Sequence, residues 1–104
     1  MPLWTLDQAR QFCVELNDYL APFGYGVGLT GGILLRGTSD KDIDVIVYPY
    51  KRVSSDFDPM YNALPNFGLK YNKLPNENRG YADDGKRVEI WDFQGKRIDL
   101  FFLT

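Results

Sequence analysis

The segment of residues 31–44 constrains this chain more than any other. A double glycine, Gly31-Gly32, follows a short apolar run, and a turn of small and polar residues separates it from Asp42 and Asp44 at the start of a second apolar run. Glycine lets backbone N–H groups approach a phosphate closely, because no Cβ stands in the way. Residues two apart in a strand point to the same face, so we expect both aspartates to converge on one point. Converging carboxylates repel each other unless a cation lies between them, and a divalent metal is the usual solution.

A third carboxylate stands in an apolar segment near the end of the chain. Asp99 lies among apolar residues of the segment 98–102. A carboxylate there is costly to bury without a partner, which favours a functional role. Glu89, in another apolar segment, is the competing candidate. Asp40 and the pair Asp83-Asp84 are weaker candidates, because both lie in loop-like stretches.

This region resembles the signature of the nucleotidyltransferase superfamily that includes DNA polymerase β. The resemblance lies in the Gly-Gly pair, its spacing to an Asp-hydrophobe-Asp motif, and the strand predicted on each side. The match is closest to the small stand-alone members, the minimal nucleotidyltransferases. In that family the first two acids bind both metals, and the third binds the metal that activates the acceptor. By motif position, the resemblance assigns these catalytic and metal-binding roles to Asp42, Asp44 and Asp99.

Five further residues are expected to bind the triphosphate of the substrate. Gly31 and Gly32 would approach it with backbone N–H groups. Ser39 would offer a hydroxyl, as a serine does at that position in many relatives. Arg36 would neutralise phosphate charge in a fork geometry, and Lys41 would either do the same or balance the neighbouring acids.

The resemblance implies an enzyme that moves a nucleoside monophosphate from a nucleoside triphosphate, ATP in the simplest case, to a hydroxyl acceptor by a two-metal mechanism. The chain has no histidine, so oxygen must hold any metal. Oxygen ligands favour Mg²⁺ or Mn²⁺ over zinc. The alternative function is a catalytically inactive binding module with the same fold, or an antitoxin-like partner protein, because a fold can outlive its activity.

A length of 104 residues suits a single domain, residues 1–104. Larger relatives add a helical domain that binds the acceptor, and this chain has no room for one. We therefore expect a partner protein or a second copy to supply that part. The resemblance offers an example, because some minimal nucleotidyltransferases pair with a small helical toxin and modify it. The net charge of −2 argues against a general nucleic-acid binder, which leaves nucleic acid only as an acceptor.

The short basic and apolar stretches suggest no further site. The basic pairs are interpreted as solvated strand ends: Lys51-Arg52, Lys86-Arg87 and Lys96-Arg97. Cys13 is the only cysteine, so no internal disulfide forms, and the apolar helical pattern around it predicts a buried thiol. No run is long enough to cross a bilayer and the first residues lack a secretory pattern, so we expect a cytoplasmic protein without a membrane partner.

The pattern of apolar residues predicts an α/β or α+β fold with a small mixed sheet flanked by two helices. A helix with Thr5 as its N-cap is expected over residues 5–20, and a second one from about residue 58 to 64. A helical turn over 33–35 and a loop over 36–41 are expected between two early strands. The strands are predicted at residues 25–30, 42–48, 67–71, 87–93 and 96–103.

Three features of these elements bear on the site. The strand at 42–48 carries Ile43, Val45 and Val47 together with Ile46, and is therefore expected to be buried on both faces. The polar segment 72–84 is the most loop-like part of the chain. Six aromatic residues are candidates for stacking a base, although core or rim positions are more typical of such residues: Tyr48, Tyr50, Tyr71, Tyr81, Trp91 and Phe93.

Overall fold

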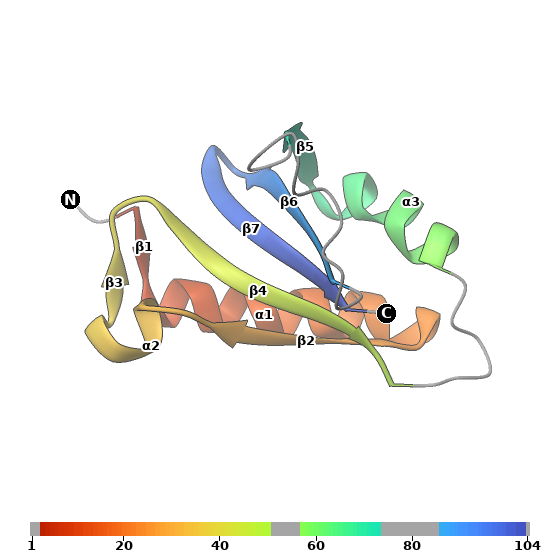
Figure 1. Cartoon of the computed structure of the whole chain (residues 1–104), viewed down its shortest axis with the longest axis horizontal. Helices are drawn as coiled ribbons and strands as arrows, with labels where there is room; N and C mark the ends of the chain where they lie inside the picture. The colour runs from red at the N-terminus through yellow and green to blue at the C-terminus, as the bar shows by residue number, and fades with distance from the viewer. Residues whose placement is uncertain (1–2, 51–56, 74–85, 104) are drawn as a thin grey trace.

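Five strands form one mixed sheet in the order β2-β4-β7-β6-β5 (Figure 1). β4 and β7 pair in parallel, and all other neighbours in the sheet are antiparallel. The computed structural model describes residues 3–50, 57–73 and 86–103. Within them the strands are β2 (Tyr25–Thr30), β4 (Asp42–Pro49), β5 (Leu69–Lys73), β6 (Lys86–Phe93) and β7 (Lys96–Leu103). The α+β class and the mixed sheet expected from the sequence are confirmed.

Helix α1 (Leu6–Leu20) begins where the sequence predicts. The Thr5 hydroxyl accepts a hydrogen bond from the Gln8 N–H at 3.2 Å, and the Gln8 side chain accepts one from the Thr5 N–H at 3.0 Å. This reciprocal pair satisfies two N–H groups that a helix start leaves open. One turn of 3-10 helix, η1 (Ala21–Phe23), and Gly24 at φ 84° end the segment. No helix in the described part of the chain is long and apolar enough to span a membrane.

The core lies between the sheet and the helices α1 and α3 (Phe57–Phe67). Alternate residues of the central strands point into it, and α1 adds an apolar stripe that includes Cys13, which is 8% exposed. The buried cysteine is therefore confirmed, and burial raises the pKa of its thiol to about 11. The main sheet residues of this core are Ile43, Val45 and Val47 of β4 and Ile98, Leu100 and Phe102 of β7.

The expectation that the strand at 42–48 is buried on both faces is wrong. Its odd-numbered apolar residues are buried, whereas Asp42, Asp44 and Ile46 are only half-buried and Tyr48 is 40% exposed. Among the described elements, the two long helices cover only the face opposite these four residues. The sequence pattern misleads here because Ile46 is apolar yet belongs to the open face.

Two boundaries differ from the predicted ones. α3 continues past residue 64 to Phe67, with Pro65 inside its last turn, and Gly68 at φ 110° then reverses the chain. Packing favours the longer helix, because the Phe67 ring lies 5.9 Å from that of Phe12 on α1. β5 consequently starts at Leu69.

Most of the predicted loop 72–84 lies outside the described residues, as do Tyr81, the pair Asp83-Asp84 and the pair Lys51-Arg52.

The hairpin of β6 and β7 is confirmed, with Gln94-Gly95 at its turn. Their φ angles are 53° and 79°. Positive φ at both central residues matches the right-handed twist of the two strands.

The predicted loop 36–41 contains a short strand, β3 (Thr38–Ser39), which pairs with β1 (Trp4–Thr5) at the start of the chain. Trp4 is 2% exposed, and its indole N–H donates to the Arg97 carbonyl at 3.0 Å. The same residue therefore joins the β3 segment to the beginning of β7. A two-residue strand has no periodicity, which explains why the sequence offered no interpretation of Trp4.

Replacing Trp4 tests this connection. Trp4→Ala empties a buried site and should lower the free energy of unfolding by about 3–5 kcal/mol, measured by urea denaturation. Trp4→Phe keeps most of the ring but removes the indole donor, so its loss should be nearer 1 kcal/mol. A Trp4→Ala variant as stable as the unmodified chain would contradict this account.

Candidate metal centre

The parallel pairing of β4 and β7 brings the three predicted carboxylates together. Asp44 lies opposite Asp99 in the register of the two strands. Asp42 precedes Asp44 by two residues and therefore shares its face. One carboxylate oxygen from each of the three residues lies within 4.8 Å of the other two. The structure thus assembles this acidic triad from two strands far apart in the sequence.

The donors of the triad fit a hard divalent cation. All three offer carboxylate oxygens, which are the ligands that Mg²⁺ and Mn²⁺ prefer. The Asp42 and Asp99 side chains are 27% and 14% exposed, so a bound ion would still be reached by water and substrate. The catalytic and metal-binding roles of the triad remain predictions.

Gly31 lies directly against the triad. Its φ is +87°, and a Cβ at this position would collide with the Asp44 carboxylate. Only glycine allows both the turn and the close approach. This contact explains why the sequence places a glycine here, between the end of β2 and helix α2 (Ile33–Arg36).

Arg97 is a member of this site that the sequence analysis missed. Its Nε donates to Asp99 Oδ1 at 3.0 Å, its Nη2 donates to Asp99 Oδ2 at 3.4 Å, and Nε lies 3.3 Å from Asp42 Oδ2. The sequence did carry a signal, because Arg97 precedes Asp99 by two residues in a strand and must share its face. The interpretation of Lys96-Arg97 as a solvated strand end is incomplete for Arg97, because its side chain is 41% exposed but also pairs with two acids.

Burial and repulsion by neighbouring carboxylates raise the pKa values of Asp42 and Asp44. Burial is the main cause that raises the pKa of Asp44 to about 6, and Asp42 and Asp99 add to it. The pKa of Asp42 is also raised, first by burial and then by Asp99, while Arg97 and Lys41 act in the opposite direction. The pKa of Arg97 is raised, chiefly by its hydrogen bond to Asp99. One guanidinium does not fully compensate three carboxylates.

A polar hollow of about 450 Å³ adjoins the triad at Asp42. It is lined by Arg36, Thr38, Ser39, Asp40, Lys41 and Asp42. Two cations, Arg36 and Lys41, line this hollow and can pair with phosphate oxygens. The hollow brings together three of the five predicted phosphate ligands.

Several of the predicted phosphate ligands already contact other groups of the protein. A Cβ at Gly32 would collide with the Arg36 guanidinium, so that side chain lies across the glycine. Ser39 Oγ donates to the Asp42 carbonyl at 2.5 Å and accepts from the Lys41 N–H at 3.4 Å. Ser39 therefore shapes the loop, and its contact with a phosphate stays a prediction.

Glu89 does not belong to the acidic triad, because it points to the helix-covered face. It is fully buried and accepts hydrogen bonds from Trp91 Nε1 at 2.8 Å and from the Tyr61 hydroxyl at 2.9 Å. The Arg87 Nε lies 2.5 Å from its other oxygen. Glu89 therefore links α3 to β6, and the choice of Asp99 over Glu89 as the third acid agrees with the structure. Asp40 lies at the rim of the polar hollow.

Most of the aromatic candidates for base stacking already contact other parts of the protein. Trp91 is buried, and Tyr71 contacts its ring edge-on at 5.6 Å. Tyr50 donates its hydroxyl to the Ala21 carbonyl at 3.2 Å. Tyr48 shares the face of the triad, but its ring lies across Gly26, where a Cβ would collide with it.

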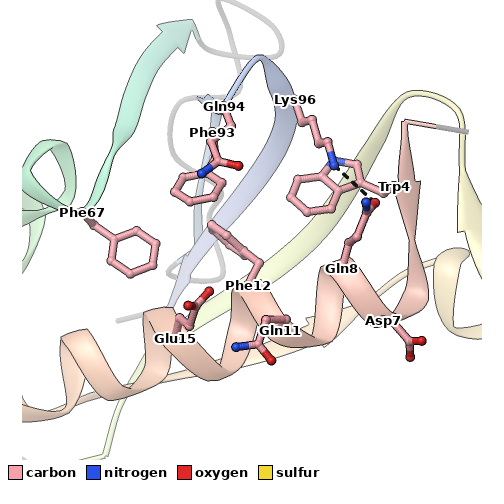
Figure 2. A pocket seen from close by; sticks show the side chains of 10 residues that line it. All are labelled: Trp4, Asp7, Gln8, Gln11, Phe12, Glu15, Phe67, Phe93, Gln94 and Lys96. Carbon is pink, nitrogen blue, oxygen red and sulfur yellow. Dashed lines mark hydrogen bonds between the residues drawn. The ribbon is translucent and has the colours of Figure 1, made fainter.

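Phe93 lines a separate hollow of about 650 Å³ between α1, α3 and the β6–β7 hairpin (Figure 2). Its ring lies 4.9 Å from that of Phe12 and 5.5 Å from that of Phe67. Lys96 lies 4.8 Å from the Trp4 ring at one end. This hollow contains no residue of the triad, and its rings pack on the core.

The raised pKa of Asp44 predicts a pH dependence. The folded protein holds the Asp44 proton more tightly than the unfolded chain does, so this group contributes stability at low pH that is lost as pH rises from about 4 through about 6. A divalent cation binds the ionised acids and offsets that loss. We expect Mg²⁺ to raise the melting temperature more at pH 8 than at pH 5, and equal shifts would contradict the assignment.

Arg97→Gln tests the electrostatic balance. Without the guanidinium, the three acids repel each other more strongly, so the metal-free variant should lose about 0.5–1.5 kcal/mol of stability after allowance for solvent screening. Mg²⁺ should recover most of this loss, measured by urea denaturation with and without the ion. The matched control is Arg10→Gln on the exposed face of α1, which should change neither value.

Comparisons with known proteins agree with the fold. No protein-family model and no curated protein matches the sequence. Among solved structures, the chain is similar to one reported as the structural basis for the activity of a cytoplasmic RNA terminal U-transferase, with a TM-score of 0.58 and 15% sequence identity. The alignment covers 93% of this chain and 28% of that chain. The similarity shows that this chain has a nucleotidyltransferase-like fold.

Proposed function

We propose that this protein is a divalent-metal-dependent nucleotidyltransferase that moves a nucleoside monophosphate from a nucleoside triphosphate to a hydroxyl acceptor. The observation that carries the proposal is the acidic triad, whose ligand oxygens lie within 4.8 Å of one another beside the Gly31 turn. The nucleotidyltransferase-like fold supports it, because strand pairing in that fold creates the triad.

Each side chain has a distinct role in this proposal. Asp42, Asp44 and Asp99 hold the metal, with Mg²⁺ the simplest choice and Mn²⁺ an alternative. The bound cation supplies positive charge to phosphate oxygens that become more negative in the transition state. Arg36 and Lys41 hold the β- and γ-phosphates in the polar hollow, where their charges offset those of the leaving group.

The reaction joins the acceptor oxygen to the α-phosphorus and breaks the bond from that phosphorus to the α–β bridging oxygen. Pyrophosphate leaves with the electron pair of the broken bond, and the hydroxyl proton passes to water. The chain's contribution is to position the reactants and to stabilise charge, because this chemistry needs little covalent help. Arg97 pairs with Asp42 and Asp99, and its guanidinium would be available to a phosphate oxygen if these acids held a metal instead.

The proposal extends to how the acceptor is bound. The chain spans 28% of the length of the terminal U-transferase structure it resembles. We propose that a partner protein or a second copy completes the acceptor site. ATP is the simplest nucleotide substrate, and nucleic acid remains one class of acceptor.

One observation favours an inactive binding module as a second candidate function. Arg97 already pairs with two of the three acids, so a cation of the protein itself occupies part of the space between them. In such a module Arg97 would remain there, and neither metal nor nucleotide would bind.

Metal-ligand variants separate the two candidates. The purified protein is incubated with Mg²⁺, a cell extract and nucleoside triphosphates labelled at the α-phosphate, and labelled acceptors are counted after electrophoresis. Asp42→Asn and Asp44→Asn should each reduce labelling about a hundredfold or more, because both remove a ligand for the charge-stabilising cation.

Asp18→Asn, an exposed substitution on α1, is the matched control and should label as the unmodified chain does. Undiminished labelling by either triad variant would overturn the assignment. No labelling, together with no rise in melting temperature in Mg²⁺ and ATP, would favour the binding module, because a ligand that binds only the folded state must stabilise it.

A further inference from the structure

A second hollow lies on the open face of the sheet, next to the triad. It has a volume of about 330 Å³ and is lined by Thr30, Gly31, Asp44, Ile46, Phe101 and Leu103. Three of these residues offer apolar side chains from β4 and β7. Asp44 is its charged member, and we call this hollow the apolar groove.

A glycine on the edge strand leaves open space beside one wall of the apolar groove. Gly28 of β2 pairs with Ile46 of β4, so any side chain at residue 28 would stand beside Ile46 on the open face. A Cβ at Gly28 meets nothing within 4 Å. At the next pair along the strand, Gly26 with Tyr48, the tyrosine ring fills the corresponding space. Glycine is disfavoured in strands, so the empty position at 28 costs stability and keeps a volume free.

The apolar groove and the polar hollow contact the triad through different acids. Asp44 lines the apolar groove, and Asp42 lines the polar hollow. In an in-line displacement the attacking and leaving oxygens lie on opposite sides of the phosphorus. Arg36 and Lys41 suit the polar hollow to the leaving phosphates, which leaves the apolar groove for the acceptor.

The walls of the groove select the chemistry of the acceptor. A sugar or polyol placed against Ile46, Phe101 and Leu103 would lose hydrogen bonds to water without replacement, which is costly. An aromatic or aliphatic ring would instead bury apolar surface there, which is favourable. Thr30 and Asp44 lie at the same groove and can orient a single hydroxyl.

We propose that the apolar groove binds the group that carries the acceptor hydroxyl, and that this group is an apolar ring rather than a sugar or polyol. The inference rests on the proposed function, because it uses the direction of the transfer reaction. The competing occupant is the base of the nucleoside triphosphate.

Methyl NMR tests the occupant directly, with 4-methylphenol as the probe and glycerol as the polyol control. The probe should produce saturable shifts at the Ile46 and Leu103 methyl groups, whereas glycerol should not. The titration is repeated with Mg²⁺ and an ATP analogue whose α–β bridge is a methylene group, which binds but cannot be cleaved. Under the proposal the analogue leaves the affinity for 4-methylphenol unchanged.

A size series at Gly28 links the probe to the groove. Gly28→Val should weaken 4-methylphenol binding by about tenfold or more, and Gly28→Ala should weaken it less. Neither substitution should lower the melting temperature, because residue 28 has open space and an ordinary strand conformation. The melting-temperature shift caused by Mg²⁺ and the analogue should be the same in both variants as in the unmodified chain.

The outcomes separate the inference from the proposed function. Displacement of the probe by the analogue, or loss of the analogue's shift in Gly28→Val, would place the base in the groove and overturn the inference. Absence of probe-specific shifts, or full binding by Gly28→Val, would also overturn it. If Mg²⁺ and the analogue fail to stabilise any variant, the proposed function fails, and the acceptor assignment fails with it even where the probe binds.

Discussion

The pairing of β4 with β7 is the interaction on which the site depends. These strands are parallel, and their register sets Asp44 directly opposite Asp99. A shift of one residue would turn either carboxylate toward the helix-covered core, because side chains alternate across a strand. The register is held by buried residues next to the acids, Ile43, Val45 and Leu100 among them. The same alternation that builds the core therefore also builds the acidic triad on the opposite face.

The triad concentrates negative charge that the rest of the molecule must accommodate. Arg97 compensates part of it from the same strand, and the pKa of Asp44 stays raised nonetheless. Glu89 provides a contrast inside the same sheet. It is more deeply buried but receives donors from Tyr61 and Trp91 and an ion pair from Arg87, so its charge is matched where it lies. Glu89 is thus a structural carboxylate whose charge protein donors compensate, whereas the charges of the triad are only partly compensated and can still bind a cation.

The sequence was informative wherever local spacing decides the outcome. Thr5 as N-cap, the Gln94-Gly95 turn and the shared face of Asp42 and Asp44 all follow from the chemistry of neighbouring residues. The meeting of Asp99 with this pair needed the family resemblance, because no local rule specifies which strands pair. Arg97 could have been found from its two-residue spacing to Asp99.

Other features depend on tertiary contacts that a single sequence does not reveal. Trp4 is held in place by its hydrogen bond to a carbonyl of β7. The extra turn of α3 is stabilised by contact with α1. The sequence did not reveal the open face of β4, because Ile46 is apolar and yet lines a groove instead of the core. The open space beside Ile46 depends on Gly28, which in the sequence only weakens a predicted strand.

The central claim is that Asp42, Asp44 and Asp99 jointly hold a divalent cation, and anomalous X-ray scattering from crystals soaked in Mn²⁺ tests it most directly. The account predicts an anomalous peak in direct contact with oxygens of all three carboxylates, with the Arg97 guanidinium moved away from Asp42. A fully soaked crystal that shows no peak at the triad, and Arg97 still paired with Asp42 and Asp99, would contradict it.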